Sequence, residues 1–364
     1  MVTTPAPVLD LSADVVSIAQ AVCDIASESG DERALADAIV AALSDAGHLE
    51  LIRDGDAVVA RTNLGRPRRV AIAGHLDTVP INGNVPTRYE DVDGERYLVG
   101  RGTVDMKSAV AVQLKLALEL TEPEHDLTWL WYDNEEVAAA LNGLGRLARN
   151  RPDLFEADFA IVGEPSNGQV EGGCNGTLRA EIRTRGVRAH TARSWMGVNA
   201  IHALGPALDR LAAFEAETIA VDGLEYREGL SAVHVAGGVA GNVVPDEAVL
   251  TVNYRFAPSR SVEEASRIVR DLFAEFEVEV VDAAPGARPG LDAAIAQEFV
   301  AAVGAVPHAK YGWTDVARFS ELGVPAVNFG PGDPIKAHAD DERVLVSQIV
   351  DGERALRAWL SGGA

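Results

Sequence analysis

The sequence has few cysteines, few basic residues and no long apolar run. Its two cysteines, Cys23 and Cys174, cannot build a disulfide framework, which indicates a reducing compartment such as the cytoplasm. The opening residues MVTTPAPVLDLSAD lack a basic segment followed by an apolar one, so we expect no signal peptide. No apolar run approaches the roughly 18–20 residues that a membrane span needs. We therefore expect a soluble, cytoplasmic protein with no membrane partner.

Positive charge is also scarce. The chain has 32 lysines and arginines against 55 aspartates and glutamates, a formal net charge of −23. Such a surface repels nucleic acid and anionic lipid, so we expect neither as a partner. It also repels anionic small molecules, which would need local arginines to hold them. Most of the surplus carboxylates are explained simply as solubilising surface charge.

The hydrophobic pattern predicts a mostly parallel α/β domain. With 364 residues, 47% of them hydrophobic, the chain can bury two separate cores. Short apolar runs alternate with helical spacing, as in sheets that helices cover on both faces. We predict strands over 68–77, 127–134, 157–165 and 324–330, and helices over 13–28, 32–46, 105–120, 141–150, 289–304 and 346–360.

A different pattern interrupts this alternation. Between residues 174 and 283 the order of predicted elements becomes β-α-β-β-α-β, which is the ferredoxin-like split motif, an antiparallel sheet with two helices. The α/β alternation resumes afterwards. The simplest account is one α/β domain, formed by 1–173 and 284–364, with a second domain inserted into it. We predict strands of the insert over 177–186, 230–238, 248–258 and 278–283, and helices over 198–214 and 262–276.

Five side chains typical of metal ligands follow strand ends. They are imidazoles and carboxylates, donors that suit zinc and similar borderline cations. The first four are spaced by about thirty residues, roughly one β-α-β step, so successive parallel strands can deliver one ligand each to a shared edge. The long gap before the fifth contains the inserted domain. These five residues are His75, Asp105, Glu136, Glu164 and His338.

Two further acids accompany these candidates. In AGHLDTVP, Asp77 follows His75 by two residues, so both side chains point to one face of an extended chain. We expect the Asp77 carboxylate to accept the ring N–H of His75. Glu135 and Glu136 point in opposite directions, so one can face a metal and the other a water molecule. Two buried like charges side by side indicate a compensating cation.

Taken singly, these residues have simpler explanations. Asp105 can be the N-cap of the helix that follows it. A strand with one polar face would explain His75 and Asp77, but the preceding run VAIAG is apolar on both faces. Single histidines are usually structural or solvated, and we assign that role to His48, His125, His202, His234 and His308.

Together the segments resemble one enzyme family. The dinuclear zinc family that contains aminoacylases, acetylornithine deacetylase and succinyl-diaminopimelate desuccinylase has segments similar to GHLDTVP, GRGTVDMKSAVA, YDNEEV, GEPSNG, GVRAHTARSW and FGPGDPIKAHADDE. The similar segments run from residue 73 to residue 342. The resemblance implies that 1–173 and 284–364 form a zinc-peptidase-like catalytic domain, and that 174–283 form a lid and dimerisation domain.

The resemblance also implies how metal is bound. Two Zn²⁺ ions per subunit, which Co²⁺ can replace, would share Asp105 as a bridging ligand. His75 and Glu164 would complete one site, and Glu136 and His338 the other. The family further implies a cis peptide bond after Asp105.

Catalytic roles follow from the same resemblance. Glu135 would be the general base that activates water for attack on an amide carbon, with Asp77 behind His75. The family places a lid histidine and an asparagine at the developing oxyanion, and His190 and Asn242 match them. In dimeric members both come from the partner subunit, so the resemblance implies a homodimer through the inserted domain.

Further segments narrow the range of expected substrates, because they are similar to the actinobacterial branch of the desuccinylases. Among them are GCNGTLR, RAHTARSWMG and YRFAPSRS. This implies hydrolysis of N-succinyl-LL-2,6-diaminopimelate, an anionic intermediate of lysine and peptidoglycan biosynthesis. Arg255 matches a carboxylate-binding position, and Thr314 and Asp315 occupy a loop near the substrate. Asn175 departs from an arginine found in some desuccinylases, which leaves recognition of the succinyl carboxylate open.

Two other functions stay open. A sister amidohydrolase, such as acetylornithine deacetylase or an aminoacylase, would use the same metal ligands and differ only in its pocket. A non-catalytic homologue would bind a ligand through the same fold, although the intact Glu135 and the full ligand set argue against it.

Overall fold

The computed structural model describes residues 7–363 and contains two compact units. The larger unit comprises the described residues up to Gly172, together with Pro289–His308 and the chain from Thr314 onward. The smaller unit comprises Gly173–Arg288 and the short segment Ala309–Trp313. Each unit has its own main sheet and its own hydrophobic core.

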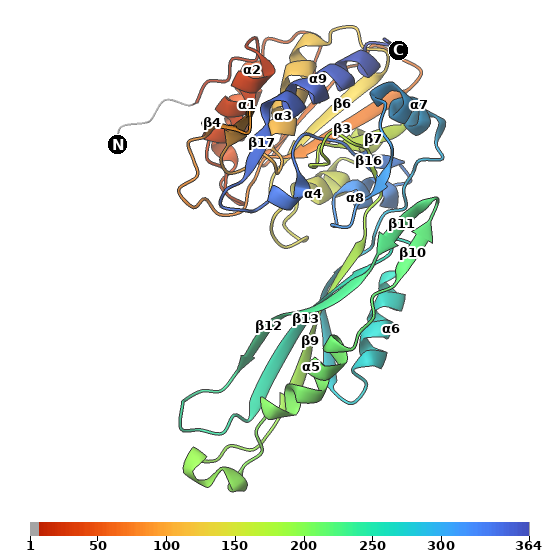
Figure 1. Cartoon of the computed structure of the whole chain (residues 1–364). Helices are drawn as coiled ribbons and strands as arrows, with labels where there is room; N and C mark the ends of the chain where they lie inside the picture. The colour runs from red at the N-terminus through yellow and green to blue at the C-terminus, as the bar shows by residue number, and fades with distance from the viewer. Residues whose placement is uncertain (1–6, 364) are drawn as a thin grey trace. The chain divides into compact units, whose positions relative to one another are not determined.

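The larger unit is built on an eight-stranded sheet of order β1-β2-β6-β3-β7-β16-β8-β15. Its four central strands, β6, β3, β7 and β16, are parallel and lie side by side in Figure 1. Every residue of β6 and β7 is buried, which explains why these runs are apolar on both faces. The strands are β1 (Glu50–Asp54), β2 (Ala57–Arg61), β3 (Arg69–His75), β6 (Asp126–Tyr132), β7 (Phe159–Val162), β8 (Glu171–Gly172), β15 (His308–Ala309) and β16 (Ala326–Asn328).

Helices cover this sheet. Helices α1, α3 and α9 contact one another, while α4 contacts β2 and β6, and α8 contacts β7 and β16. Local signals set some of the ends: the Asp14 carboxylate caps α1 by accepting the N–H groups of Val16 and Ser17. The helices are α1 (Val15–Asp24), α2 (Arg33–Leu43), α3 (Lys107–Glu119), α4 (Gly143–Asn150), α7 (Ala294–Val303), α8 (Val316–Glu321) and α9 (Val346–Leu360), with 3₁₀ turns η1 (Pro152–Phe155) and η4 (Pro334–Lys336).

A second, antiparallel sheet of the larger unit has the order β17-β5-β4. Strands β4 (Arg88–Val92) and β5 (Glu95–Val99) form a hairpin, and β17 (Arg343–Leu345) pairs with β5 from far along the chain. The sequence pattern did not predict this sheet. This sheet brings distant parts of the chain together, because the pairing places the residues just before β17 beside those just after β5.

The smaller unit contains the predicted β-α-β-β-α-β motif. Its four-stranded antiparallel sheet has the order β12-β13-β9-β14, which is the ferredoxin-like arrangement, and the predicted fold class is confirmed. Helix α6 begins with a capping box between Ser261 and Glu264. The elements are β9 (Gly176–Arg185), α5 (Gly205–Ala212), β12 (Gly229–Gly237), β13 (Glu247–Phe256), α6 (Val262–Leu272) and β14 (Glu277–Ala284), with 3₁₀ turns η2 (Thr191–Met196) and η3 (His202–Leu204).

Two details of this unit differ from the prediction. The helix expected over 198–214 is an α-helix only from Gly205, after the turn η3, because Pro206 supplies no N–H and sits in the first turn. A hairpin of β10 (Thr218–Val221) and β11 (Leu224–Arg227) follows that helix and was not predicted.

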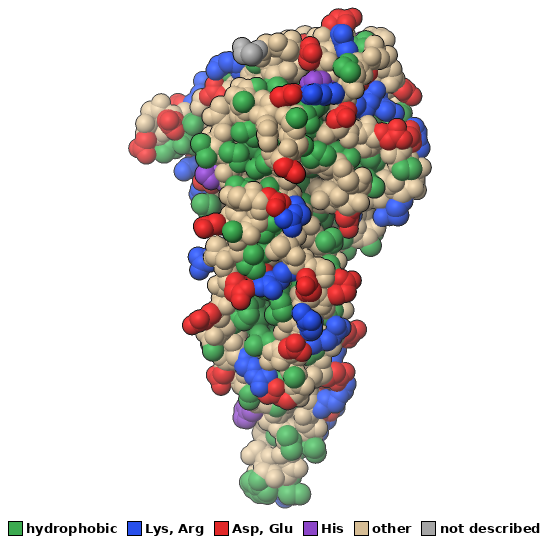
Figure 2. Space-filling view, turned by 90° about the vertical axis from the view of Figure 1, so that its right-hand side faces the viewer, with side chains coloured by type: hydrophobic (Ala, Val, Ile, Leu, Met, Phe, Trp, Pro, Cys, Tyr) green, Lys and Arg blue, Asp and Glu red, His purple; other side chains and the backbone are tan. Residues whose placement is uncertain are grey.

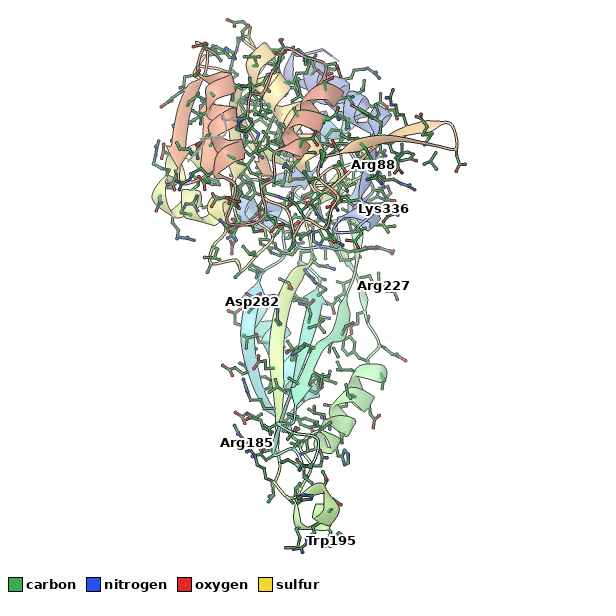
Figure 3. All side chains as sticks on the ribbon, turned by 90° about the vertical axis from the view of Figure 1, so that its left-hand side faces the viewer. Arg88, Arg185, Trp195, Arg227, Asp282 and Lys336 are labelled. Atoms are coloured by element: carbon green, nitrogen blue, oxygen red, sulfur yellow. The ribbon has the colours of Figure 1, made fainter. Side chains whose placement is uncertain are left out.

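Charged side chains of both signs are interspersed on the face drawn in Figure 2. The sheet of the smaller unit also carries cross-strand ion pairs, including Arg179 with Asp282 and Arg185 with Glu277, each at 3.4 Å. Figure 3 labels Asp282 and Arg185 toward opposite ends of this sheet. Within residues 7–363, none of the helices has the combined length and apolar character of a membrane span.

Candidate metal centre

The five predicted metal ligands all belong to the larger unit and lie close together. His75 ends β3, Glu136 follows β6 and Glu164 follows β7, so three neighbouring parallel strands deliver side chains to one edge. Asp105 lies just before α3, and His338 just after η4. Ligand atoms of His75, Asp105 and Glu164 lie within 4.8 Å of one another, as do those of Asp105, Glu136 and His338.

Asp105 is common to both groups. One of its carboxylate oxygens lies 3.0 Å from Nε2 of His75, and the other lies 3.3 Å from Nε2 of His338. The second imidazole also lies 2.8 Å from a carboxylate oxygen of Glu136. Imidazole nitrogens and carboxylate oxygens in two groups that share one carboxylate fit a pair of divalent cations.

Electrostatics support this fit. Burial raises the pKa of Glu135 well above its usual value, and the nearby acids Asp315, Glu164 and Glu136 act in the same direction. Hydrogen bonds to Asp105 and Glu136 raise the pKa of His338 to about 10. The cluster therefore attracts protons strongly when no metal is present, and divalent cations would compensate the same negative charge.

The backbone around Asp105 settles two of the expectations drawn from the sequence. The peptide bond between Asp105 and Met106 is cis, as predicted. Helix α3 is capped at Met106 and receives no side-chain hydrogen bond there, so the alternative explanation of Asp105 as the helix cap does not hold.

Asp77 supports the centre differently from the prediction. Nδ1 of His75 lies 2.9 Å from the backbone carbonyl oxygen of Asp77, and 3.6 Å from its carboxylate. Because a carbonyl only accepts, Nδ1 carries a proton, which leaves Nε2, on the side of Asp105, as the nitrogen that would bind a metal. The buried Asp77 carboxylate instead accepts the backbone N–H groups of Glu135 and Glu136, at 2.9 and 3.0 Å. It thereby orients both glutamates.

Sequence reasoning missed two neighbours of these residues. The hydroxyl of Ser29 donates to the Asp77 carboxylate at 2.7 Å. Tyr132 is the register partner of His75 on β6, and its ring meets the imidazole edge-on with centroids 6.3 Å apart. Only the position of Tyr132, at the end of an apolar strand and three residues before Glu135, could have suggested it.

Thr314 and Asp315 also belong to the larger unit, and both are buried. The Thr314 hydroxyl donates to Oδ1 of Asn328 at 2.8 Å, and the Asp315 carboxylate accepts hydrogen bonds from Asn142 and Arg318. Their side chains therefore have partners within the chain. Contact of this loop with substrate stays a prediction.

The remaining predicted site residues lie in the smaller unit. His190 and Asn242 are exposed and close to each other, because Thr191 N–H donates to the carbonyl of Asn242 at 3.0 Å. Arg255 is half-buried on β13. Asn175 is buried, and its amide donates to the carbonyl of Arg227 at 3.0 Å.

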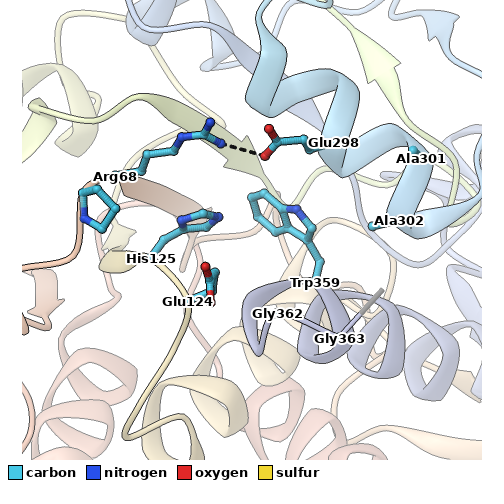
Figure 4. A pocket seen from close by; sticks show the side chains of 10 residues that line it. Arg68, Glu124, His125, Glu298, Ala301, Ala302, Trp359, Gly362 and Gly363 are labelled. Atoms are coloured by element: carbon cyan, nitrogen blue, oxygen red, sulfur yellow. Dashed lines mark hydrogen bonds and ion pairs between the residues drawn. The ribbon is translucent and has the colours of Figure 1, made fainter.

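The larger unit also has a cavity of about 740 Å³ away from the metal cluster (Figure 4). Arg68 and His125, which line it, directly precede β3 and β6, so it lies at the opposite ends of the strands that carry the metal cluster. Its Arg68 is already paired with Glu298 at 2.7 Å. Among the described residues, the groups of potential metal ligands do not include those of this cavity. The metal cluster is therefore the better candidate.

The chain is similar to a family of peptidases and to proteins named as desuccinylases. Residues 71–361 match the model of peptidase family M20/M25/M40. The DapE protein of Mycobacterium tuberculosis, named provisionally as a succinyl-diaminopimelate desuccinylase, is 54% identical over 97% of this chain and 100% of its own length. The succinyl-diaminopimelate desuccinylase of Corynebacterium glutamicum is 47% identical over 98% of both chains.

More distant proteins share the fold. An acetylornithine deacetylase from Myxococcus xanthus is 31% identical over 79% of this chain and 78% of its own. The crystal structure of a tripeptidase from Staphylococcus aureus matches with a TM-score of 0.76 at 20% identity, over 97% of this chain and 98% of that one. With the family match covering most of the sequence, the chain belongs to peptidase family M20/M25/M40, as the resemblance in its motifs predicted.

Proposed function

We propose that this chain hydrolyses the amide bond of N-succinyl-LL-2,6-diaminopimelate and releases succinate and LL-diaminopimelate, the latter a precursor of lysine and peptidoglycan. The observation that carries the proposal is the cluster of five ligand side chains next to Glu135, in a chain 47–54% identical to proteins named as desuccinylases. Acetylornithine deacetylase is the less favoured alternative, because the relative of that name is only 31% identical over 79% of the chain.

In this proposal the ligand cluster holds two Zn²⁺ ions, with Co²⁺ as a substitute. His75 and Glu164 would bind one, Glu136 and His338 the other, and Asp105 both. When bound, the ions would supply Lewis acidity that polarises the scissile carbonyl and makes water a better nucleophile at neutral pH. The two groups of ligand atoms that share Asp105 support this division.

Glu135 is proposed as the general base. Its backbone N–H is held by Asp77, and burial raises the pKa of its carboxyl group well above the usual value, the direction that favours a proton acceptor. It would take a proton from the attacking water and return it to the leaving amine. Glu136, held by the other oxygen of the same aspartate, would stay a ligand.

We expect Glu135→Gln to lower kcat by several orders of magnitude while the protein still binds two zinc ions, since the amide cannot accept the proton. Elemental analysis and turnover of the same preparation test this. Glu136→Gln is the matched comparison, and it should lose metal. If Glu135→Gln instead loses zinc and Glu136→Gln keeps it, the two roles are exchanged.

Arg255 is proposed to bind a substrate carboxylate. Burial lowers the pKa of its guanidinium, and Nε donates to Oδ1 of Asn253 at 3.0 Å. Within residues 7–363 it has no ion pair, whereas the more deeply buried Arg101 pairs with Glu342. A half-buried arginine without an acidic partner suits a substrate that carries three carboxylates. Contacts of Asn175, Thr314 and Asp315 with this substrate remain part of the same proposal.

The substrate assignment predicts strong discrimination. The kcat/KM for N-succinyl-LL-diaminopimelate should exceed that for N-acetylornithine by at least about a hundredfold, because leaving the half-buried Arg255 without the carboxylate that it would bind costs roughly 2–5 kcal/mol. Arg255→Ala should damage hydrolysis of the succinylated substrate far more than that of the acetylated one. Steady-state kinetics on both substrates measure this.

Arg185→Ala is the control, because Arg185 lies on the same sheet but is exposed and paired with Glu277. It should leave both activities close to wild type. Equal turnover of the two substrates, or an equal effect of Arg255→Ala on each, would favour a broad-specificity deacylase.

A homodimer through the smaller unit completes the proposal. Strand β12 is an edge strand, and Val233 and Val235 on it are each 57% exposed. Trp195, which Figure 3 labels beyond the end of the sheet, is 76% exposed, and its neighbour Met196 is 68% exposed. Such an edge and such side chains are suited to pairing with a second copy.

His190 and Asn242 would act across that interface as hydrogen-bond donors to the developing oxyanion. Nδ1 of His190 accepts the N–H of Ala192 at 3.1 Å, so a neutral ring carries its proton on Nε2, where it can donate. This proton position suits the proposed role.

Mixing His190→Ala with Glu135→Gln protein should therefore restore part of the activity that each variant lacks alone, because a mixed dimer keeps one site with both groups intact. Activity after subunit exchange, monitored by labelled subunits, is the measurement. Confirmed exchange without recovery would show that His190 serves its own subunit or none.

A further inference from the structure

We infer that Glu342 is a positioning residue for the metal centre, and that its buried pair with Arg101 holds three ligand-bearing segments in register. The inference rests on the metal centre of the proposed function. Neither residue is among the ligands or the catalytic residues assigned above. Glu342 is 1% exposed and Arg101 is 4% exposed, so solvent does not screen the pair.

Glu342 holds the backbone that leads into Asp105. One carboxylate oxygen accepts the N–H groups of Val104 and Asp105, at 2.9 and 3.1 Å. The other oxygen lies 2.9 Å from Nη1 of Arg101. The carboxylate therefore fixes the amide of the residue whose side chain is shared by both ligand groups.

Arg101 connects the same carboxylate to two further segments. Its Nη1 also donates to the carbonyl of Ala339, the residue after His338, at 3.2 Å. Its Nε donates to the carbonyl of Pro80, in the loop that follows His75, at 3.2 Å. One guanidinium thus contacts the chain directly after His338 and the loop that follows His75, while Glu342 contacts the chain at Asp105.

The small sheet explains how these segments meet. Register pairing of Arg343 on β17 with Val99 on β5 is continued by the hydrogen bond from the N–H of Gly100 to the carbonyl of Glu342, at 2.9 Å. Glu342 N–H in turn donates to the carbonyl of Ala339. The ladder therefore carries the chain after His338 directly alongside the chain before Asp105.

His338 needs this support more than His75 does. Its side chain is 51% exposed, whereas that of His75 is 1% exposed and packed beside Tyr132. Its backbone has φ of 64°, in the left-handed region that few side chains other than asparagine, aspartate and histidine adopt. Packing alone does not hold this imidazole. Besides the contacts of Nε2 with Glu136 and Asp105, its position depends on the hydrogen bonds of the neighbouring backbone.

The competing explanation is that the pair of Glu342 and Arg101 only stabilises the fold and does not position the metal ligands. Asp126, with Arg69 nearby, provides a matched control for this explanation. Asp126 is also buried, accepts the N–H groups of Leu64 and Arg66 at 2.8 Å each, and lies 3.8 Å from Arg69. It stands at the start of β6, the opposite end from the metal cluster. Asp126→Asn therefore removes a similar buried charge without touching a ligand segment.

The experiment compares Glu342→Gln with Asp126→Asn. Zn²⁺ affinity of each metal-free protein is measured in competition with a chromophoric chelator, and thermal unfolding is measured on the same samples. Glu342→Gln should weaken Zn²⁺ binding by about 10–100-fold, the range typical of residues that orient ligands. Asp126→Asn should stay within about twofold of wild type in Zn²⁺ affinity, although it unfolds at a lower temperature.

Arg101→Lys is the second variant, and it decides the case if Glu342→Gln does not fold. Lysine keeps the charge but cannot contact Glu342, Ala339 and Pro80 together, so Zn²⁺ affinity should still fall at least tenfold. Affinity within about threefold of wild type for the folded variant, or equal losses in it and in Asp126→Asn, would overturn the inference. A wild-type chain that takes up no Zn²⁺ would contradict the metal centre itself, and the inference with it.

Discussion

Four carboxylates, Asp105, Glu135, Glu136 and Glu164, crowd the edge of the central sheet at which β3, β6 and β7 end. Like charges at such short range repel each other unless cations or protons compensate them, and the cost grows as water is excluded. The imidazoles of His75 and His338 contribute nitrogen donors to the same cluster. A pair of divalent cations is the compensation that this donor set suits best, and the proposed chemistry depends on it.

The surrounding structure positions these charged side chains. Parallel strands bring their carboxyl ends to one edge, which accounts for the positions of His75, Glu136 and Glu164. Asp105 lies between the first two in sequence and reaches this edge from the segment before α3, not from a strand as its spacing had suggested. Asp77 fixes the backbone of both glutamates through a single carboxylate, so that one can serve as base and the other as ligand. The last ligand segment reaches the edge by a different route, through the pairing of β17 with β5. Arg101 and Glu342 contact the backbone of both segments, at Ala339 and at Asp105.

Much of this architecture could be predicted from local pattern. Strands β3 and β6 are recognisable because burial on both faces requires a continuous apolar run, and the β-α-β-β-α-β order of the smaller unit follows from periodicity alone. Strands β4 and β5 were missed because their exposed positions carry charged residues, as in RYEDV and ERYLV. No local signal announces that β17 pairs with β5, since that contact joins distant parts of the chain. For the same reason Glu342, in the acidic run DDE, cannot be distinguished from a surface acid by its sequence. The contact of His75 with Asp77 was predicted, but it is made by the backbone carbonyl of Asp77 and not by its side chain.

Zinc titration of the metal-free protein, followed by elemental analysis and by hydrolysis of N-succinyl-LL-diaminopimelate, tests the central claim most directly. The account predicts two Zn²⁺ ions retained per chain, and hydrolysis that appears with zinc and disappears with a chelator. Folded protein that retains no zinc, or full hydrolysis of this substrate in the presence of the chelator, would contradict it.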